Sequence, residues 1–151
     1  MPKIGDFFPE GERRESAARQ LTAGRVLYLM CDFTHPPKNK FVVVAAPDDP
    51  PLLLVLNSKI HPYIIARPDL RDCQATLTAK EHDFLSRDSF LDCSRTYESM
   101  SRETILWQLV GDVSRVKGEL SATARIEVVE MIRRAKTISA VHRSRILAVL
   151  V

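Results

Sequence analysis

The sequence predicts an α+β fold in which a small β-barrel is followed by C-terminal α-helices. Three short apolar runs lie between polar loops in residues 24–60, which is typical of strands in a small barrel. The runs at 41–46 and 52–57 are apolar at nearly every position, so each is expected to be covered on both faces. After residue 97 the apolar spacing becomes helical, which indicates that helices follow the barrel.

The composition fits one intracellular domain. With 151 residues, of which 45% are hydrophobic, the chain is long enough to bury an ordinary core. No apolar run approaches the roughly 20 residues of a membrane-spanning helix, and the N-terminal residues lack the apolar region of a secretory signal. We therefore expect a soluble, cytoplasmic protein with no membrane partner.

The cysteines and histidines predict neither a disulfide framework nor a metal site. Cys31, Cys73 and Cys93 are odd in number and lack a close metal-binding spacing, so free, buried thiols are expected. None of the four histidines lies at an HxxxH or HExxH spacing from another. No metal and no cofactor are therefore predicted.

Local composition predicts the elements up to residue 97. The charged segment 10–21 contains no β-branched residue, which favours a short helix in an N-terminal arm, residues 1–23. Gly24 interrupts the helical pattern, and the barrel is expected to span residues 24–97. The expected strands are residues 25–30, 41–46, 52–57, 73–78 and 89–94, with an irregular segment at 61–72.

The segment 98–151 is expected to form a helical extension. Its three helices are predicted to begin at serine N-caps, because a serine oxygen can accept a hydrogen bond from the first turn. The caps are Ser101, Ser121 and Ser139. Trp107 is expected in the core at helical spacing from its apolar neighbours. The second helix is expected to bury a broad apolar face made of Ile126, Val128, Val129, Met131 and Ile132.

Polar side chains lie where the apolar runs begin and end. His35, Lys38 and Lys40 precede the second expected strand, and Ser58 follows the third. If adjacent strands pair, these groups converge at one rim of the barrel. Each type also has a structural role, because edge lysines prevent aggregation and serine hydroxyls satisfy local backbone groups.

Positive charge is concentrated in the last third of the chain. Residues 1–100 carry 13 basic and 14 acidic side chains, whereas residues 101–151 carry nine and five. Lys and Arg can neutralise phosphates, so this segment is compatible with nucleic-acid contact, with a solvated helix surface as the alternative. The basic cluster consists of Arg133, Arg134, Lys136, Arg143 and Arg145.

Three pieces of the β region form a recognisable series: GRVLY at residues 24–28, HPPKNK at 35–40 ahead of FVVV, and LVLNS at 54–58. The series resembles the PemK/MazF family of toxin endoribonucleases, which have an SH3-like barrel. In that family a Gly-x-Val type strand leads through a polar loop to a basic residue and an apolar strand, and a third strand ends in a hydroxyl-bearing motif. The resemblance covers residues 24–94.

This resemblance implies metal-independent cleavage of single-stranded RNA, with an antitoxin protein as partner. In such a reaction the 2′-hydroxyl attacks the phosphate and leaves a cyclic phosphate and a 5′-hydroxyl. Lys38 or Lys40 would take the place of the family's loop arginine, and Ser58 that of its strand-end hydroxyl. A lysine offers a point charge instead of the bidentate fork of arginine. His35 is the candidate general acid or base.

Two functions remain open from the sequence. One is a toxin-like ribonuclease, a hydrolase that uses His35, Lys38, Lys40 and Ser58. The other is a non-catalytic SH3-like binding module that engages a protein or nucleic acid. The C-terminal extension has three alternative roles: an element that forms a homodimer, a cover over an RNA groove, or a docking surface for a partner.

Overall fold

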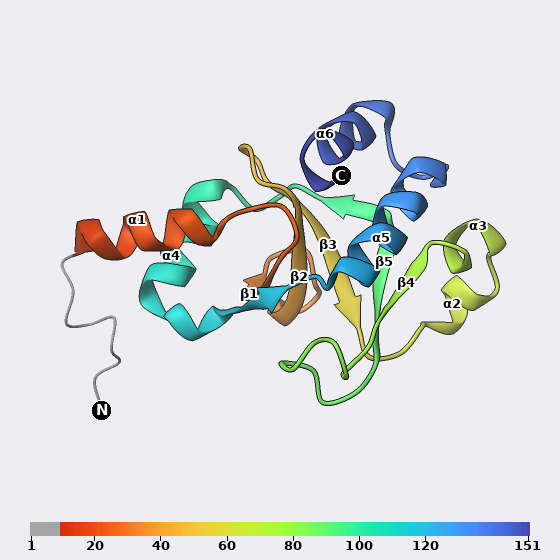
Figure 1. Ribbon diagram of the computed structural model, residues 1–151, viewed down its shortest axis with the longest axis horizontal. Helices are drawn as coiled ribbons and strands as arrows, with labels where there is room; N and C mark the ends of the chain where they lie inside the picture. Colours follow the sequence, from red (N-terminus) through yellow and green to blue (C-terminus); the bar gives the residue numbers. More distant parts are fainter. Residues whose placement is uncertain (1–9) are drawn as a thin grey trace.

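The computed structural model describes residues 10–151 and places a six-stranded antiparallel sheet between two layers of helices (Figure 1). The first nine residues of the expected N-terminal arm lie outside the described part. The strands are β1 (Arg25–Cys31), β2 (Lys38–Ala46), β3 (Leu52–Asn57), β4 (Gln74–Leu77), β5 (Ser89–Tyr97) and β6 (Val116–Glu119). The helices are α1 (Glu10–Gln20), α2 (Pro62–Ile65), α3 (Pro68–Arg71), α4 (Arg102–Gly111), α5 (Ala122–Arg134) and α6 (Ala140–Leu150).

The sheet is a curled half-barrel with two edges. Its strand order is β4-β5-β3-β2-β1-β6, so β4 and β6 are the outer strands of the described sheet. The closed barrel expected from the apolar strands is therefore wrong in this respect, because helices on both faces bury those strands without closure. The strands also do not end near residue 97, since β6 pairs antiparallel with β1 after α4.

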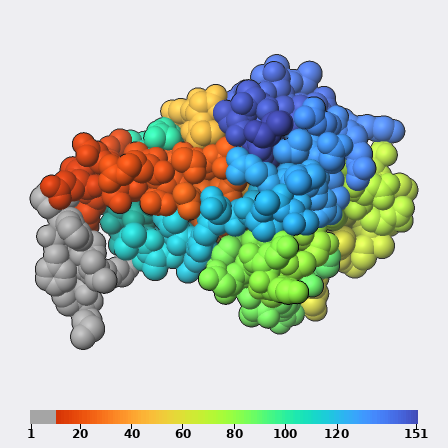
Figure 2. Space-filling model, viewed as in Figure 1, coloured from red at the N-terminus to blue at the C-terminus, as the bar shows by residue number. Residues whose placement is uncertain are grey.

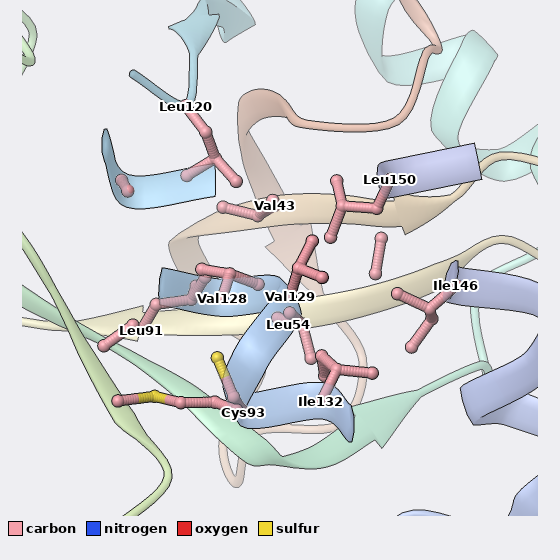
Figure 3. Packing of buried hydrophobic residues seen from close by; sticks show 14 of the residues in the cluster. Val43, Leu54, Leu91, Cys93, Leu120, Val128, Val129, Ile132, Ile146 and Leu150 are labelled. Carbon is pink, nitrogen blue, oxygen red and sulfur yellow. The ribbon is translucent and has the colours of Figure 1, made fainter. Parts of the chain in front are cut away.

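Apolar side chains are buried on both faces of the sheet. On one face, Val43 and Leu54 pack with Val128, Ile132 and Ile146 of α5 and α6 (Figure 3). The prediction that residues 41–46 and 52–57 would be covered on both faces is confirmed. Their cover includes more than the C-terminal helices, because α1 takes part on the second face.

The second face of the sheet is covered by α1 and α4. Leu27 and Val42 of the sheet pack with Leu21, which follows α1, and with Ile105 and Leu109 of α4. Figure 2 shows α1 lying along the segment that contains α4, with α5 and α6 farther to the right in the same view. The helical layers therefore hold the sheet from opposite sides.

The three predicted helix starts are confirmed. The hydroxyl oxygens of Ser101, Ser121 and Ser139 each accept a hydrogen bond from the backbone N–H three residues later. The segment 61–72 is not irregular, because α2 and α3 each begin with a proline, a residue favoured in the first helical turn. Within residues 10–151, no helix has both the length and the apolar character that crossing a bilayer requires.

Two of the expected core residues are at the surface. Trp107 is 70% exposed and Ile126 is 68% exposed. In α4 the buried side chains are Ile105, Leu106 and Leu109, and Trp107 points away from that face because successive helical positions differ by about 100°. The three cysteines are free and buried as predicted, and burial raises the pKa of the Cys31 thiol to about 11.

Gly24 connects α1, the sheet and the segment after β6. Its N–H donates to the carbonyl of Val44 at 2.7 Å, and its own carbonyl accepts from the N–H of Leu120 at 2.9 Å. Its φ of +89° favours glycine, and a Cβ here would lie 2.8 Å from the Nη1 atom of Arg125. The glycine at the start of the GRVLY motif is thus required by backbone geometry.

Candidate functional site

A cleft of about 490 Å³ opens at the end of the sheet where β2 begins and β3 ends. Three parts of the chain contribute to it: the paired strands β1 and β2, the end of β3 with the turn that follows, and the loop ahead of β5. The lining residues are Tyr28, Asn39, Lys40, Phe41, Leu56, Asn57, Ser58, Lys59, Phe84, Leu85, Ser86, Arg87 and Ser89.

The strand register brings Lys40 to Asn57. β2 and β3 are antiparallel with Val42 opposite Val55, so two residues further along Lys40 lies opposite Asn57. The Nζ of Lys40 donates a hydrogen bond to the Oδ1 of Asn57 at 2.6 Å. Ser58 follows directly and lines the same cleft. Lys40 and Ser58 therefore both border this cleft, but the alternation along β2 turns the Lys40 side chain to the face of Val42, opposite the face that carries Phe41.

The ammonium group of Lys40 is perturbed by its surroundings. Partial burial lowers the pKa of Lys40, and the positive charge of Lys38 lowers the pKa further. A lysine with a lowered pKa gives up its proton more readily than an ordinary surface lysine. This property suits a group that donates a proton to a leaving oxygen.

The other two predicted site residues lie outside the cleft lining. His35 is exposed in the turn between β1 and β2, and Lys38 is exposed at the first position of β2. Lys38 lies close enough to influence Lys40 electrostatically, but it does not line the cleft. The geometry thus divides the four predicted residues into a pair in the cleft and a pair beside it.

Aromatic rings form one wall of the cleft. Tyr28 and Phe41 lie on paired positions of β1 and β2, with ring centroids 4.9 Å apart, and Phe84 lies 6.0 Å from Phe41. All three side chains are half-buried, so part of each ring remains accessible. An accessible ring beside cations is the combination that binds single-stranded nucleic acid.

Cationic and amide groups surround this aromatic wall. Arg115 lies just ahead of β6, and its Nη1 donates to the Oδ1 of Asn39 at 2.9 Å and to the carbonyl of Tyr28 at 2.8 Å. Lys59 and Arg87 are exposed at the rim. The described lining residues include no histidine, aspartate or glutamate.

The loop at residues 78–88 is held in place by His82, which is 1% exposed. Its Nδ1 lies 2.8 Å from the carbonyl oxygen of Thr78, which makes Nδ1 the protonated nitrogen. Its Nε2 then accepts a hydrogen bond from the N–H of Ser121 at 3.0 Å, at the start of α5. His82 thereby fixes the loop that supplies Phe84 and Arg87 to the cleft.

Sequence reasoning missed this loop entirely. Residues 80–88 look like a polar connection, and Phe84 and Arg87 lie 26 and 29 positions after Ser58 in the chain. Only the pairing of β5 with β3 brings the loop to the cleft. No local pattern in the sequence of this segment indicates that it contributes to a site.

The C-terminal basic cluster is divided by the structure. Arg143 donates to the backbone carbonyls of Ile132, Ala135 and Ile138, and Arg145 forms an ion pair with Asp48 at 3.0 Å. These two arginines therefore fasten α6 to its neighbours. The other members, Arg133, Arg134 and Lys136, are exposed.

Comparison with known proteins adds no relative to this description. No protein-family model matches the chain, and no curated protein matches its sequence. In the described part of the chain, no group of three or more His, Cys, Asp or Glu side chains is arranged to hold a metal ion.

Proposed function

We propose that the protein is a toxin-like, metal-independent endoribonuclease of the PemK/MazF type that cleaves single-stranded RNA in the cytoplasm. The observation that carries the proposal is the hydrogen bond from the ammonium group of Lys40 to Asn57, two residues that border the cleft together with Ser58. On this proposal the curled sheet is a variant of the SH3-like barrel of that family.

Lys40 is the proposed proton donor. In the reaction the 2′-oxygen forms a bond to phosphorus while the bond from phosphorus to the 5′-oxygen breaks. The leaving 5′-oxygen takes a proton from the Nζ of Lys40, and the products are a cyclic phosphate and a 5′-hydroxyl. The lowered pKa of Lys40 supports this role, because a donor works best when its pKa approaches the working pH.

Ser58, Lys59 and Arg87 are the proposed phosphate-binding groups. A hydroxyl and two cations at one rim can stabilise the negative charge that grows on the phosphate oxygens in the transition state. The proton of the attacking 2′-hydroxyl passes to water, since no imidazole or carboxylate is present among the described lining residues. Lys38 acts indirectly, by lowering the pKa of Lys40.

The alternative function is binding of single-stranded nucleic acid without cleavage. The lack of an imidazole or carboxylate in the described lining favours this alternative, because a positioned base normally accelerates the attack of a hydroxyl. Both functions use the same cleft. An antitoxin protein and a homodimer remain predictions from the family resemblance and from the C-terminal segment.

Incubation with RNA tests the proposal. Purified protein is mixed with single-stranded RNA of mixed sequence in EDTA, and the new ends are analysed for 2′,3′-cyclic phosphate. We expect discrete cyclic-phosphate products from the natural sequence and from Lys136→Ala, whose lysine is exposed outside the cleft, and far slower formation of these products with Lys40→Ala. Intact RNA with the natural sequence, together with measurable RNA binding, would support the non-catalytic alternative.

A further inference from the structure

We propose that the cleft holds one unpaired base of its RNA against the wall formed by Tyr28, Phe41 and Phe84, with the amide group of Asn39 donating a hydrogen bond to the edge of that base. The inference rests on the proposed function for the identity of the ligand. It names the part of the RNA that the cleft takes and the residues that hold it.

The aromatic wall has the size and exposure that a base needs. The cleft volume of about 490 Å³ lies in the range of sites for small organic groups. The three rings are half-buried, so each offers a face or an edge to a ligand, and Phe41 and Phe84 are also fixed by packing against the core. Every nucleobase has a flat π-surface, and stacking on aromatic side chains is the usual way in which single-stranded RNA is held.

Phe84 is positioned by close contacts. A Cβ at Gly118 of β6 would meet two ring atoms of Phe84 at 3.1 Å, so the ring lies directly over the glycine backbone. The ring of His82 meets Phe84 edge-on, with centroids 5.8 Å apart. Because His82 itself is buried and bonded at both ring nitrogens, the wall is fixed before a ligand arrives.

Asn39 presents a donor to the cleft. Arg115 donates to the Oδ1 of Asn39, which fixes the orientation of the amide and leaves its NH₂ group as the part able to bond a ligand. Asn39 and Phe41 are alternate residues of β2 and so lie on the same face of the sheet. A base stacked beside Phe41 therefore lies next to this donor, and each of the four bases offers an acceptor at its edge.

The combination of cations and aromatic rings favours RNA over an apolar peptide segment. Lys59 and Arg87 stand at the rim, where the phosphates on either side of a bound base would lie. The Nζ of Lys117 lies 5.8 Å from the ring centroid of Tyr28. Flanking phosphates and a central flat base together match a wall of rings bordered by cations.

A binding cycle tests the inference without depending on cleavage. The probe is a short, fluorescein-labelled 2′-O-methyl RNA, which has no free 2′-hydroxyl to attack, together with versions in which each base in turn is replaced by an abasic sugar. Dissociation constants are measured by fluorescence anisotropy in EDTA for the natural sequence and for Phe84→Leu. Phe33→Leu is the matched control, because Phe33 is half-buried against Tyr97 and does not line the cleft.

We expect one abasic position to weaken binding by roughly tenfold, the size of a lost base-aromatic stack. Phe84→Leu should weaken binding of the intact probe by a similar factor but should not weaken binding of that abasic probe further. Phe33→Leu should change neither the binding of the intact probe nor the binding of the abasic probe. The abasic series with the natural sequence is decisive even if a variant folds poorly.

The two proposals fail in different ways. If unmodified RNA is cleaved but no abasic position affects binding, the base-holding inference is overturned and the nuclease proposal stands. If one abasic position matters but unmodified RNA stays intact, the nuclease proposal is overturned and the inference stands. If the probe does not bind and unmodified RNA stays intact, both are overturned.

Discussion

The Nζ of Lys40 lies 2.6 Å from the Oδ1 of Asn57, across the paired strands β2 and β3. This contact fixes the ammonium group of a residue that borders the cleft, and burial and a second lysine lower the pKa of that group. Asn57 is a neutral partner, so it orients the ammonium without the strong stabilisation of charge that a carboxylate would give. The register of β2 and β3 thus sets the position of the proposed proton donor.

The pH dependence of cleavage should follow the charge around Lys40. If Lys40 donates its proton, activity falls as the pH rises through its pKa. Lys38→Ala removes a positive charge that lowers this pKa, and Asn57→Asp adds a negative charge that raises it. Both variants should therefore retain cleavage to higher pH than the natural sequence, measured as the rate constant between neutral and alkaline pH.

His35→Ala provides the control for this series. The histidine lies in the turn just ahead of Lys38, is exposed and does not line the cleft. Removal of His35 should leave the pH at which the cleavage rate constant falls on the alkaline side unchanged. If the fall of the rate constant at alkaline pH occurs at the same pH in Lys38→Ala, in Asn57→Asp and in the natural sequence, a group other than Lys40 causes it.

RNA binding should depend on cations of the cleft and not on the exposed C-terminal cluster. Lys59→Ala and Arg87→Ala should each reduce affinity and lower the slope of log K against log salt by about one unit, because each removes a phosphate contact. The double variant Arg133→Ala, Lys136→Ala removes two exposed charges outside the cleft. An equal loss of slope in that double variant would place the RNA at the C-terminal end of α5 instead.

Gly24→Ala should destabilise the fold. The φ of +89° strains any residue with a Cβ, and the new methyl group would meet the guanidinium of Arg125. We expect a loss of about 1–3 kcal/mol in the free energy of unfolding, measured by urea denaturation. Gly11→Ala is the comparison, since no atom lies within 4 Å of a Cβ at that helical position, and it should be neutral or stabilising.

The two isoleucines of α5 should differ sharply in their contribution to stability. Ile132 is fully buried between α5, α6 and the sheet, so Ile132→Ala should cost about 2–5 kcal/mol in urea denaturation. Ile126 is 68% exposed, and Ile126→Ala should change stability by less than about 0.5 kcal/mol. Similar losses for both would mean that the outer face of α5 is covered in solution.

Fluorescence should report the position of Trp107. It is the one tryptophan of the sequence and is 70% exposed on α4. Its emission should therefore resemble that of tryptophan in water and should be quenched efficiently by acrylamide in the folded protein. Emission shifted to shorter wavelength, with weak quenching, would indicate that another surface covers α4.

Several elements were predictable because local chemistry decides them. The serine caps at Ser101, Ser121 and Ser139 satisfy exposed backbone groups of the first turn, and this depends on neighbouring residues alone. The continuous apolar runs at 41–46 and 52–57 likewise required cover on both faces, whatever provides it.

Other features depended on contacts between distant parts of the chain. Whether Trp107 is buried is decided by the rotation of α4 about its axis, which is set by packing of Ile105 and Leu109 on the sheet. The strand β6 is only four residues long and becomes a strand because the edge of β1 is free to pair with it. Nothing in its own composition indicates this pairing.

The candidate site likewise combines residues that could be placed from the sequence with residues that depend on distant contacts. Lys40 and Ser58 could be placed together because a hairpin joins β2 to β3 and brings its two ends to one rim. Phe84 and Arg87 are brought to that rim by the pairing of β5 and by the hydrogen bonds of His82. One ring nitrogen of His82 bonds Thr78, four positions earlier in the chain, and the other bonds Ser121, 39 positions later. Such contacts follow from the assembled fold and leave no local pattern.

A bridging phosphorothiolate tests the central claim, that Lys40 protonates the leaving oxygen, most directly. In this RNA a sulfur atom replaces the 5′-oxygen of a single linkage, and a thiolate leaves without needing a proton. We predict that Lys40→Ala cleaves ordinary RNA far more slowly than the natural sequence does but cleaves the phosphorothiolate RNA at a nearly equal rate. Equal losses on both substrates would contradict the assignment of Lys40 as the proton donor.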